Sequence, residues 1–182
     1  MAILDIENSL VLIIDVQEKL LNASFNKELI KKKSEIIAKT TSILNIPVIV
    51  TEQYPKGLGE TTLEIKNNLS EKALFFEKTS FSALDDENIF ENIKSTNKKQ
   101  IVVFGIETHI CVNQTVSALI HAGYDVHVVK DASGSRAESE FFAGIERMKN
   151  NGASILTTEI LLFEWLKTSK HPSFKEIQNL IK

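Results

Sequence analysis

Short, uninterrupted apolar runs recur along the chain, and most of them are followed by a polar or charged residue. Runs of this length that are rich in β-branched residues are typical of strands covered on both faces, as in a parallel sheet. On this basis we predict six strands, at positions 9–14, 46–51, 73–76, 101–104, 125–129 and 153–156.

Longer stretches with helical spacing of apolar residues separate these runs. The clearest lies at 27–44, where paired apolar residues return at heptad intervals, as on an amphipathic helix laid against a sheet. Asn45 can end this helix, and Asp85 or Asp86 can cap another at 87–95. Further helical patterns begin near positions 63, 110, 137, 157 and 173, the last of them capped by Ser173. In the helix that ends near Gly152, the predicted buried stripe comprises Phe141, Phe142, Ile145 and Met148.

Strands that alternate with helices predict an α/β fold. We expect three α/β/α layers around a six-stranded parallel sheet, joined by right-handed crossovers. A length of 182 residues is suited to one domain covering 1–182. No GxGxxG follows the first run and no GxxxxGK[ST] occurs, so the sequence offers no phosphate cradle for a nucleotide.

Composition and charge narrow the functional classes. A net charge of −3 gives no electrostatic case for nucleic acid or for an anionic membrane. No apolar run approaches the length of a membrane span, and the first residues lack a basic region followed by an apolar one. The single cysteine excludes an internal disulfide. We expect a soluble cytoplasmic protein.

That cysteine, Cys111, occupies a position suited to chemistry. Gly105 breaks the apolar run at 101–104, and a helix follows from about Ile110, so Cys111 lies where a strand passes into the first turn of a helix. Free N–H groups and the helix dipole stabilise an anion there and lower the pKa of a thiol. The alternative is a small buried hydrophobe, and spacing alone leaves both interpretations open.

Asp15 and Lys78 end two other strands, which in a parallel sheet meet Cys111 at one edge. Alternatively, Asp15 caps a turn with Gln17, and Lys78 is solvated. If the three converge, Cys111 is the nucleophile, Asp15 exchanges protons with the thiol and the leaving group, and Lys78 keeps Asp15 ionised. Backbone N–H groups before Cys111 form an oxyanion hole. The implied reaction is acyl transfer to water through a thioester.

The loop at 52–60 follows the second strand and should overhang the same edge. It carries Pro55, and Tyr54 can either line a pocket or pack beside that proline. We predict that a small-molecule substrate is contacted by Gln17, Glu52, Gln53, Tyr54 and Phe81.

Six stretches follow one another along the chain: LVLIIDVQ, FEKTSFSA, VVFGIETHICVNQT, DASGSR, ERMKNNGA and TTEILLFEWL. Taken together, these motifs resemble the isochorismatase-like cysteine hydrolase superfamily, which includes nicotinamidases and N-carbamoylsarcosine amidase. The resemblance runs over nearly the whole chain. The loop VTEQYPKGLG and the ending HPSFKEIQNLIK are similar to the subgroup called isochorismatase domain-containing proteins.

The resemblance implies an Asp–Lys–Cys triad at Asp15, Lys78 and Cys111. It also implies a cis peptide bond between Ile106 and Glu107, with the amides of Glu107 and Cys111 as the oxyanion hole. Members commonly form oligomers, so we expect a homo-oligomer, with the exposed faces of the last two helices as contacts.

One departure from the family concerns metal. Nicotinamidases carry an aspartate and two histidines near the second strand, but here that region holds no histidine. The four histidines lie elsewhere without ligand-like spacing, and His109 is expected to pack as a turn residue. We therefore expect no catalytic metal and no cofactor, and neither nicotinamide nor isochorismate is the expected substrate.

Three functional hypotheses follow. The leading one is a metal-independent cysteine hydrolase of a small amide or a similar C–N bond. The second is a binding or scaffold protein that keeps the fold without catalysis. The third is a redox-sensing thiol, for which the chain lacks a resolving cysteine.

Overall fold

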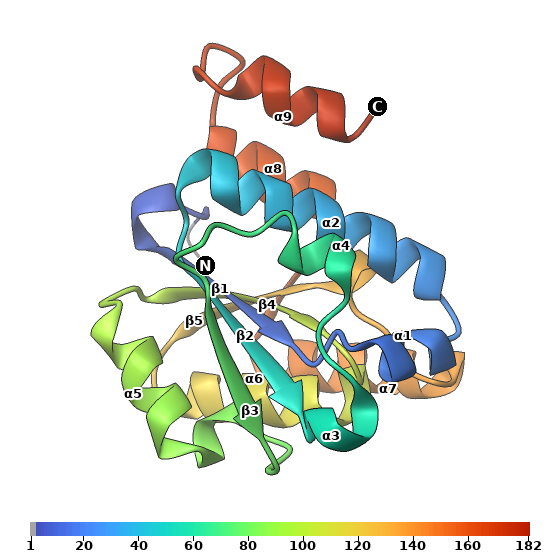
Figure 1. Cartoon of the computed structure of the whole chain (residues 1–182). Helices are drawn as coiled ribbons and strands as arrows, with labels where there is room; N and C mark the ends of the chain where they lie inside the picture. Colours follow the sequence, from blue (N-terminus) through green and yellow to red (C-terminus); the bar gives the residue numbers. More distant parts are fainter. Residues whose placement is uncertain (1–2) are drawn as a thin grey trace.

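All strands of the computed structural model, which describes residues 3–182, run parallel in one sheet. The six strands follow the spatial order β3-β2-β1-β4-β5-β6, so the chain starts in the middle and builds outward in both directions (Figure 1). This confirms the predicted fold class. The strands are β1 (Ser9–Ile14), β2 (Val48–Gln53), β3 (Leu74–Lys78), β4 (Gln100–Gly105), β5 (Asp125–Val129) and β6 (Ser154–Leu156).

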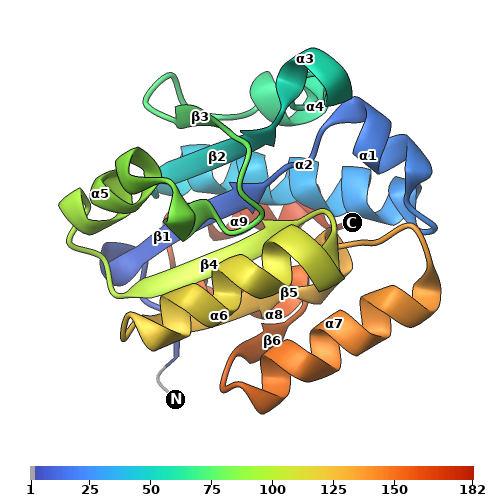
Figure 2. The same ribbon diagram turned by 90° about the horizontal axis from the view of Figure 1, so that it is seen from below.

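Helices cover both faces of the sheet (Figures 1 and 2). One face carries α2 (Lys27–Leu44), α4 (Leu63–Lys66) and α8 (Thr158–Leu166), with α9 (Phe174–Leu180) outside α8. The other carries α5 (Glu87–Ser95), α6 (Asn113–His121) and α7 (Glu138–Asn150). The shorter helical segments are η1 (Ile6–Asn8), α1 (Glu18–Ala23), α3 (Pro55–Leu58), η2 (Ala83–Asp85), η3 (Thr108–Val112) and η4 (Lys130–Ala132).

The core consists of two clusters separated by the sheet. Successive side chains of β1 point to opposite faces, so Val11 and Ile13 pack under α2 and α8 while Leu12 and Ile14 pack against α5 and α6. All six residues of β1 are buried, because helices cover both sides of this central strand. Burial of each such aliphatic side chain contributes about 1.5–3 kcal/mol.

Several helix boundaries follow the sequence pattern. α2 has the predicted limits and ends at Asn45, which adopts a left-handed conformation with φ of 55°. Asp86 caps α5 by accepting hydrogen bonds from the amides of Asn88 and Ile89. The predicted cap of the last helix is wrong, because the Ser173 side chain makes no cap hydrogen bond to α9.

The predicted buried stripe of α7 is also wrong at one position. Phe142 is 58% exposed, whereas Phe141 and Met148 are buried. The buried face is centred on Gly144, which approaches η3 so closely that a Cβ there would lie 3.0 Å from the backbone of His109. This close backbone packing sets the rotation of α7 and turns Phe142 outward.

β3 is longer than the apolar run that predicted it. It continues to Lys78, which pairs in register with Gln53 of β2. β3 lies at the edge of the sheet, and its Leu74 and Phe75 are 43% and 42% exposed. The charged residues Glu77 and Lys78, which follow the apolar run, therefore belong to the strand. Lys78 is buried, although Glu77 and Thr79 beside it are exposed.

The polar segment 130–136, which contains the DASGSR motif, lies largely inside the molecule. Ser133 and Ser135 are fully buried. The segment pairs with the chain after β4, since Gly134 N donates to Gly105 O and Thr108 N donates to Gly134 O at 2.8 Å. Backbone hydrogen bonding thus compensates the burial of polar groups that composition assigns to the surface.

Gly105 permits the close approach of β1 and β4 at the edge where the site forms. Its φ is +143°, and a Cβ at this position would lie 1.9 Å from the carbonyl oxygen of Ile14. That carbonyl also accepts a hydrogen bond from Ile106 N at 2.9 Å, so neither strand can move aside.

Replacement of Gly105 by Ala is therefore expected to lower the free energy of unfolding by more than about 4 kcal/mol or to prevent folding. Gly123→Ala is the matched control, because Gly123 also has a positive φ but a Cβ added there would have nothing within 4 Å. It should cost only about 1–2 kcal/mol for the left-handed conformation. Chemical denaturation measures both, and equal losses would contradict the steric explanation.

No helix in the part of the chain from residue 3 onward is long and apolar enough to cross a membrane.

Candidate active site

Asp15 follows β1 in a conformation that turns the chain away from the sheet. Its φ is +51°, a left-handed value that aspartate tolerates better than most residues. Its amide donates to Thr51 O at 3.1 Å, and its carbonyl accepts from Gln17 N at 2.8 Å. The two sequence interpretations of Asp15 are therefore compatible. Asp15 forms a turn with Gln17, and its fully buried carboxylate faces Lys78.

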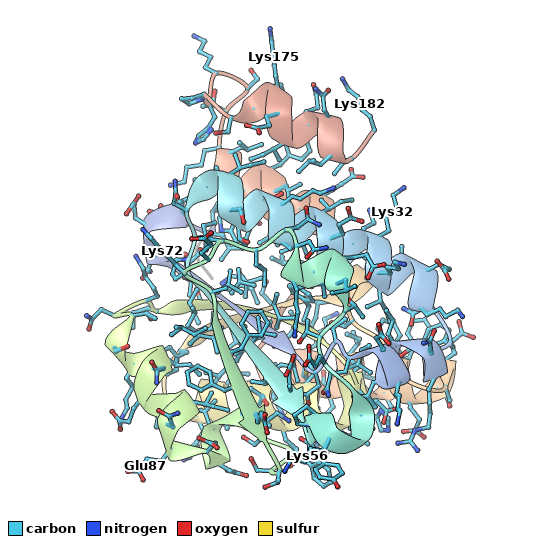
Figure 3. All side chains as sticks on the ribbon, viewed as in Figure 1. Lys32, Lys56, Lys72, Glu87, Lys175 and Lys182 are labelled. Atoms are coloured by element: carbon cyan, nitrogen blue, oxygen red, sulfur yellow. The ribbon has the colours of Figure 1, made fainter. Side chains whose placement is uncertain are left out.

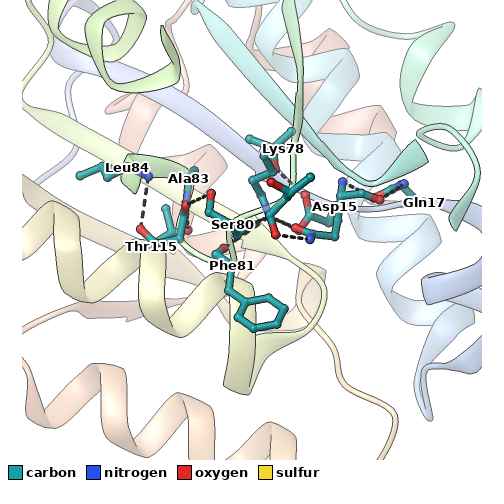
Figure 4. A network of polar contacts seen from close by, with 12 residues as sticks. Asp15, Gln17, Lys78, Ser80, Phe81, Ala83, Leu84 and Thr115 are labelled. Carbon is teal, nitrogen blue, oxygen red and sulfur yellow. Dashed lines mark hydrogen bonds and ion pairs between the residues drawn. The ribbon is translucent and has the colours of Figure 1, made fainter. Parts of the chain in front are cut away.

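Lys78 and Asp15 form a buried ion pair. Lys78 Nζ lies 2.7 Å from Asp15 Oδ2, and neither side chain is exposed. The same ammonium donates to Gln53 Oε1 at 2.6 Å and to the carbonyl oxygens of Ser80 and Phe81 at 3.2 and 3.3 Å (Figure 4). A buried ion pair is tolerated only when such further hydrogen bonds offset the loss of hydration.

Thr51 holds the other oxygen of the carboxylate. Its hydroxyl donates to Asp15 Oδ1 at 2.6 Å, and both groups are buried. Each carboxylate oxygen of Asp15 therefore has a fixed donor, which sets the orientation of the carboxylate. The sequence analysis missed Thr51, although alternation along β2 could have found it, because Thr51 and Gln53 share one face of the strand.

Cys111 lies beside this pair, in the π-helical turn η3 that precedes α6. Cys111 is 6% exposed. The pKa of the thiol is raised to about 12, chiefly by burial; the negative charge of Asp15 also raises it, whereas the ammonium of Lys78 lowers it. The prediction that the start of the helix lowers this pKa is wrong, because desolvation outweighs it. Since both charges act on the thiol, the structure brings Asp15, Lys78 and Cys111 together.

The chain between β4 and Cys111 is shaped by two features. The peptide bond between Ile106 and Glu107 is cis, at the position that the family resemblance implies. The Glu107 carboxylate accepts from Arg136 N at 3.0 Å, Nε at 2.9 Å and Nη2 at 2.6 Å. Burial raises the pKa of Glu107, but the hydrogen bonds and charge of Arg136 outweigh it and hold this pKa below its usual range. The side chain of Glu107 is thus engaged by Arg136, and an oxyanion hole from the amides of Glu107 and Cys111 stays a prediction.

Of the residues predicted to contact a substrate, Gln17 and Gln53 bind each other. Gln17 is fully buried; its Oε1 accepts from Gln53 N at 2.7 Å and its Nε2 donates to Gln53 O at 3.0 Å and to Gly59 O. Gln53 in turn contacts Lys78. Both glutamines therefore lie at the site, but their polar groups are engaged by the protein itself.

Glu52 is not brought to this site. It points to the opposite face of β2 from Thr51 and Gln53, where its carboxylate accepts from the amide and the hydroxyl of Thr61, both at 2.7 Å. Lys66 lies 3.6 Å from it. Alternation of side chains along a strand explains this placement.

Tyr54 and Phe81 lie at the surface near the ion pair, 57% and 53% exposed. The ring of Tyr54 packs over Gly57, since a Cβ added at Gly57 would lie 2.4 Å from the ring. The Tyr54 side chain therefore folds back on its own loop. Phe81 follows the loop whose carbonyls hold Lys78, and its ring extends away from the ion pair (Figure 4).

The histidines do not assemble a metal site in the described range. Within residues 3–182, no three side chains of the metal-ligating types cluster. His109 packs at the start of η3, where its Nδ1 lies 3.0 Å from Ser135 Oγ, as expected for a turn residue.

Comparison with known proteins decides the family. Residues 9–160 match the family model described as Isochorismatase domain. The chain belongs to the isochorismatase family. It is 38% identical over 176 residues to isochorismatase domain-containing protein 2 of Xenopus laevis, covering 96% of this chain and 83% of that protein.

Solved structures of isochorismatase-like proteins share the fold. The structure of "MAR1 ribonuclease" from Caenorhabditis elegans superposes with a TM-score of 0.94 at 37% identity, covering 99% of this chain and 92% of that one. YcaC from Pseudomonas aeruginosa, solved with hexane-2,5-diol and covalent acrylamide, gives 0.91 at 26% identity, covering 97% and 90%. YcaC from Escherichia coli, described as an octameric hydrolase of unknown specificity, gives 0.88 at 26% identity, covering 98% and 94%.

The charges around Cys111 predict whether each substitution speeds or slows the alkylation of Cys111 by iodoacetamide between pH 7 and 9. Below its pKa a thiol reacts in proportion to its thiolate fraction, so the wild type should react more slowly than a free thiol with a pKa of about 8.5. Asp15→Asn removes a charge that raises the pKa of Cys111 and should accelerate the reaction, whereas Lys78→Met should slow it.

Mass spectrometry of the intact chain measures these rates, and Cys111→Ala provides the unreactive control. Thermal unfolding of each variant identifies any that is not folded. If both variants were alkylated faster than the wild type, or both more slowly, the result would contradict the electrostatic arrangement.

Proposed function

We propose that this isochorismatase-family protein is a cysteine hydrolase that cleaves a small amide or a similar C–N bond through a thioester on Cys111. Family membership supports a hydrolase-type function. The observation that carries the finer proposal is the 2.7 Å Asp15–Lys78 pair, buried beside a thiol whose pKa responds to both charges.

In the first half-reaction, Cys111 Sγ attacks the substrate carbonyl while its proton passes to Asp15. The carbonyl oxygen becomes an oxyanion, which the amides of Glu107 and Cys111 stabilise. Collapse of this intermediate breaks the C–N bond, and the leaving nitrogen takes the proton from Asp15. The product of this half-reaction is an acyl group bound to Cys111 as a thioester, with the amine released.

In the second half-reaction, water attacks the thioester and gives a proton to Asp15. The C–S bond breaks, the carboxylic acid leaves, and the proton on Asp15 returns to the sulfur. Asp15 therefore acts twice as base and twice as acid, and the enzyme is regenerated without any other reactant.

A raised thiol pKa is consistent with this cycle. With a pKa of about 12, Cys111 is protonated at rest near neutral pH, so it needs a base at the moment of attack. The hydrogen bonds that Thr51 and Lys78 donate to Asp15 fix the orientation of its carboxylate, which supports the proposal that Asp15 is this base. Covalent acrylamide in the related YcaC structure supports a reactive nucleophile in the family, since acrylamide is an electrophile.

Turnover of a panel of small primary amides and carbamoyl compounds, followed by ammonia release, tests the proposal. At least one compound should be hydrolysed by the wild type, and Cys111→Ala should reduce the rate by more than about a thousandfold while unfolding at a similar temperature. Hydrolysis that survives in Cys111→Ala would refute the nucleophile, and inertness of the wild type toward the whole panel would favour a binding protein with this fold.

A second candidate function comes from a relative. The structure that shares 37% identity with this chain is described as a ribonuclease. Against it stand the net charge of −3 and the scatter of the labelled lysines over different sides of the molecule (Figure 3). These labelled lysines are Lys32, Lys56, Lys72, Lys175 and Lys182.

One assay distinguishes the two candidate functions, amidase and ribonuclease. Purified wild type and Cys111→Ala are incubated with a fluorescent single-stranded RNA, and we expect no cleavage by either above a buffer control. RNA cleavage by the wild type that disappears in Cys111→Ala would replace the amidase proposal with a ribonuclease.

We also propose that the protein forms a homo-oligomer. The octameric YcaC relative supports this, as does an apolar patch in which Ile3, Ile160 and Phe163 are 68%, 44% and 43% exposed. Two of these residues lie on α8, one of the two helices expected to make contacts.

A further inference from the structure

Three segments that meet at the site are joined by the side chains of two glutamines. The segments are the turn after β1, the loop that follows β2 up to Gly59, and the loop at 79–81 that follows β3. Gln17 belongs to the first and binds the backbone of the second, through Gln53 N, Gln53 O and Gly59 O. Gln53 ends β2 and contacts the third.

The side-chain amide of Gln53 bridges the ion pair and the 79–81 loop. Its Oε1 accepts from Lys78 Nζ at 2.6 Å, and its Nε2 donates to Thr79 O at 2.8 Å. Lys78 Nζ itself donates to Ser80 O and Phe81 O. The loop is therefore held from two sides, by the ammonium of Lys78 and by the side-chain amide of Gln53.

The hydrogen-bonding capacity of these groups is used up inside the protein. Lys78 Nζ has three N–H groups and faces four acceptors, from Asp15, Gln53, Ser80 and Phe81. Both ends of the Gln53 amide and both ends of the Gln17 amide are also paired. Groups arranged in this way fix one another's positions and have little capacity left for a substrate.

We propose that Gln53 is a positioning residue that locks the 79–81 loop against the Asp15–Lys78 pair, beside Cys111, by holding Lys78 and Thr79 together. It sets how open the site is, and it does so without touching the reacting atoms. The inference rests on the proposed function for the role of Cys111. It corrects the expectation that Gln53 contacts the substrate, and it assigns Gln17 the task of holding the Gln53 backbone in place.

Gln53→Met tests the lock, because methionine matches the length of glutamine but offers neither the acceptor for Lys78 nor the donor for Thr79. Thr40→Val is the matched control. It removes a buried hydroxyl that donates to Ile36 O at 2.8 Å within α2, on the opposite face of the sheet. Thermal unfolding shows whether the two variants are destabilised to a similar extent.

Two readouts are measured on the full chain. The first is the rate at which chymotrypsin cleaves the chain after Phe81, measured by mass spectrometry, because cleavage requires the loop to leave its fixed position. The second is the ratio of Cys111 alkylation rates by N-ethylmaleimide and by the smaller iodoacetamide, since a change in thiol pKa affects both reagents alike and a change in access favours the larger one.

In Gln53→Met we expect cleavage after Phe81 to accelerate at least tenfold, and the ratio of alkylation rates to rise several-fold. Thr40→Val should leave both at wild-type values. If either readout in Gln53→Met stays at the wild-type value, the proposal is overturned. Neither readout requires turnover, so failure of the hydrolase assay and failure of this inference are distinguishable.

If Gln53→Met does not fold, Gln53→Glu decides the question. This variant keeps an acceptor for Lys78 and loses only the donor to Thr79. Cleavage after Phe81 should then accelerate by a smaller factor, and cleavage at the wild-type rate would overturn the proposal.

Discussion

The arrangement of the site depends on one buried ion pair. Asp15 and Lys78 contribute opposite charges that are shielded from water, and the effective cost of burying each is several kcal/mol. The fold offsets this cost with donors and acceptors from the ends of β2 and β3: the Thr51 hydroxyl and the Gln53 amide of β2, and two loop carbonyls after Lys78. These partners give both charged groups fixed orientations, and they bring β1, β2 and β3 to a common edge.

The same pair determines the state of the thiol. Cys111 is nearly enclosed, so its ionisation is disfavoured, and the two neighbouring charges act on it in opposite directions. In the proposed hydrolase cycle such a thiol needs a base during attack, and the carboxylate of Asp15, oriented by Thr51 and Lys78, is the group proposed for that role. The helix start that follows Cys111 has less effect on the pKa of the thiol than burial does.

Much of the fold follows from local patterns, because strands covered on both faces and amphipathic helices leave clear signals. The six strands, the limits of α2 and the Asp86 cap were predictable for this reason. The convergence of Asp15, Lys78 and Cys111 was predictable as well, because two of them end parallel strands and the third begins the helix after another strand, and these ends meet at one edge of the sheet. Two expectations failed because they depend on tertiary packing: Phe142 faces outward because Gly144 packs on η3, and burial, which the sequence does not show, raises the pKa of the thiol. Glu52 faces away from the site because side chains alternate along β2, a local rule that separates it from Thr51 and Gln53.

The central claim is that an acyl group is carried by the sulfur of Cys111. The most direct measurement is rapid acid quenching during hydrolysis of a substrate found by screening, followed by peptide mass spectrometry. The account predicts a mass increase equal to the acyl group on the peptide that contains Cys111, removable by hydroxylamine as a thioester is. Steady product formation with no adduct on that peptide at any quenching time, or an adduct on another residue, would contradict it.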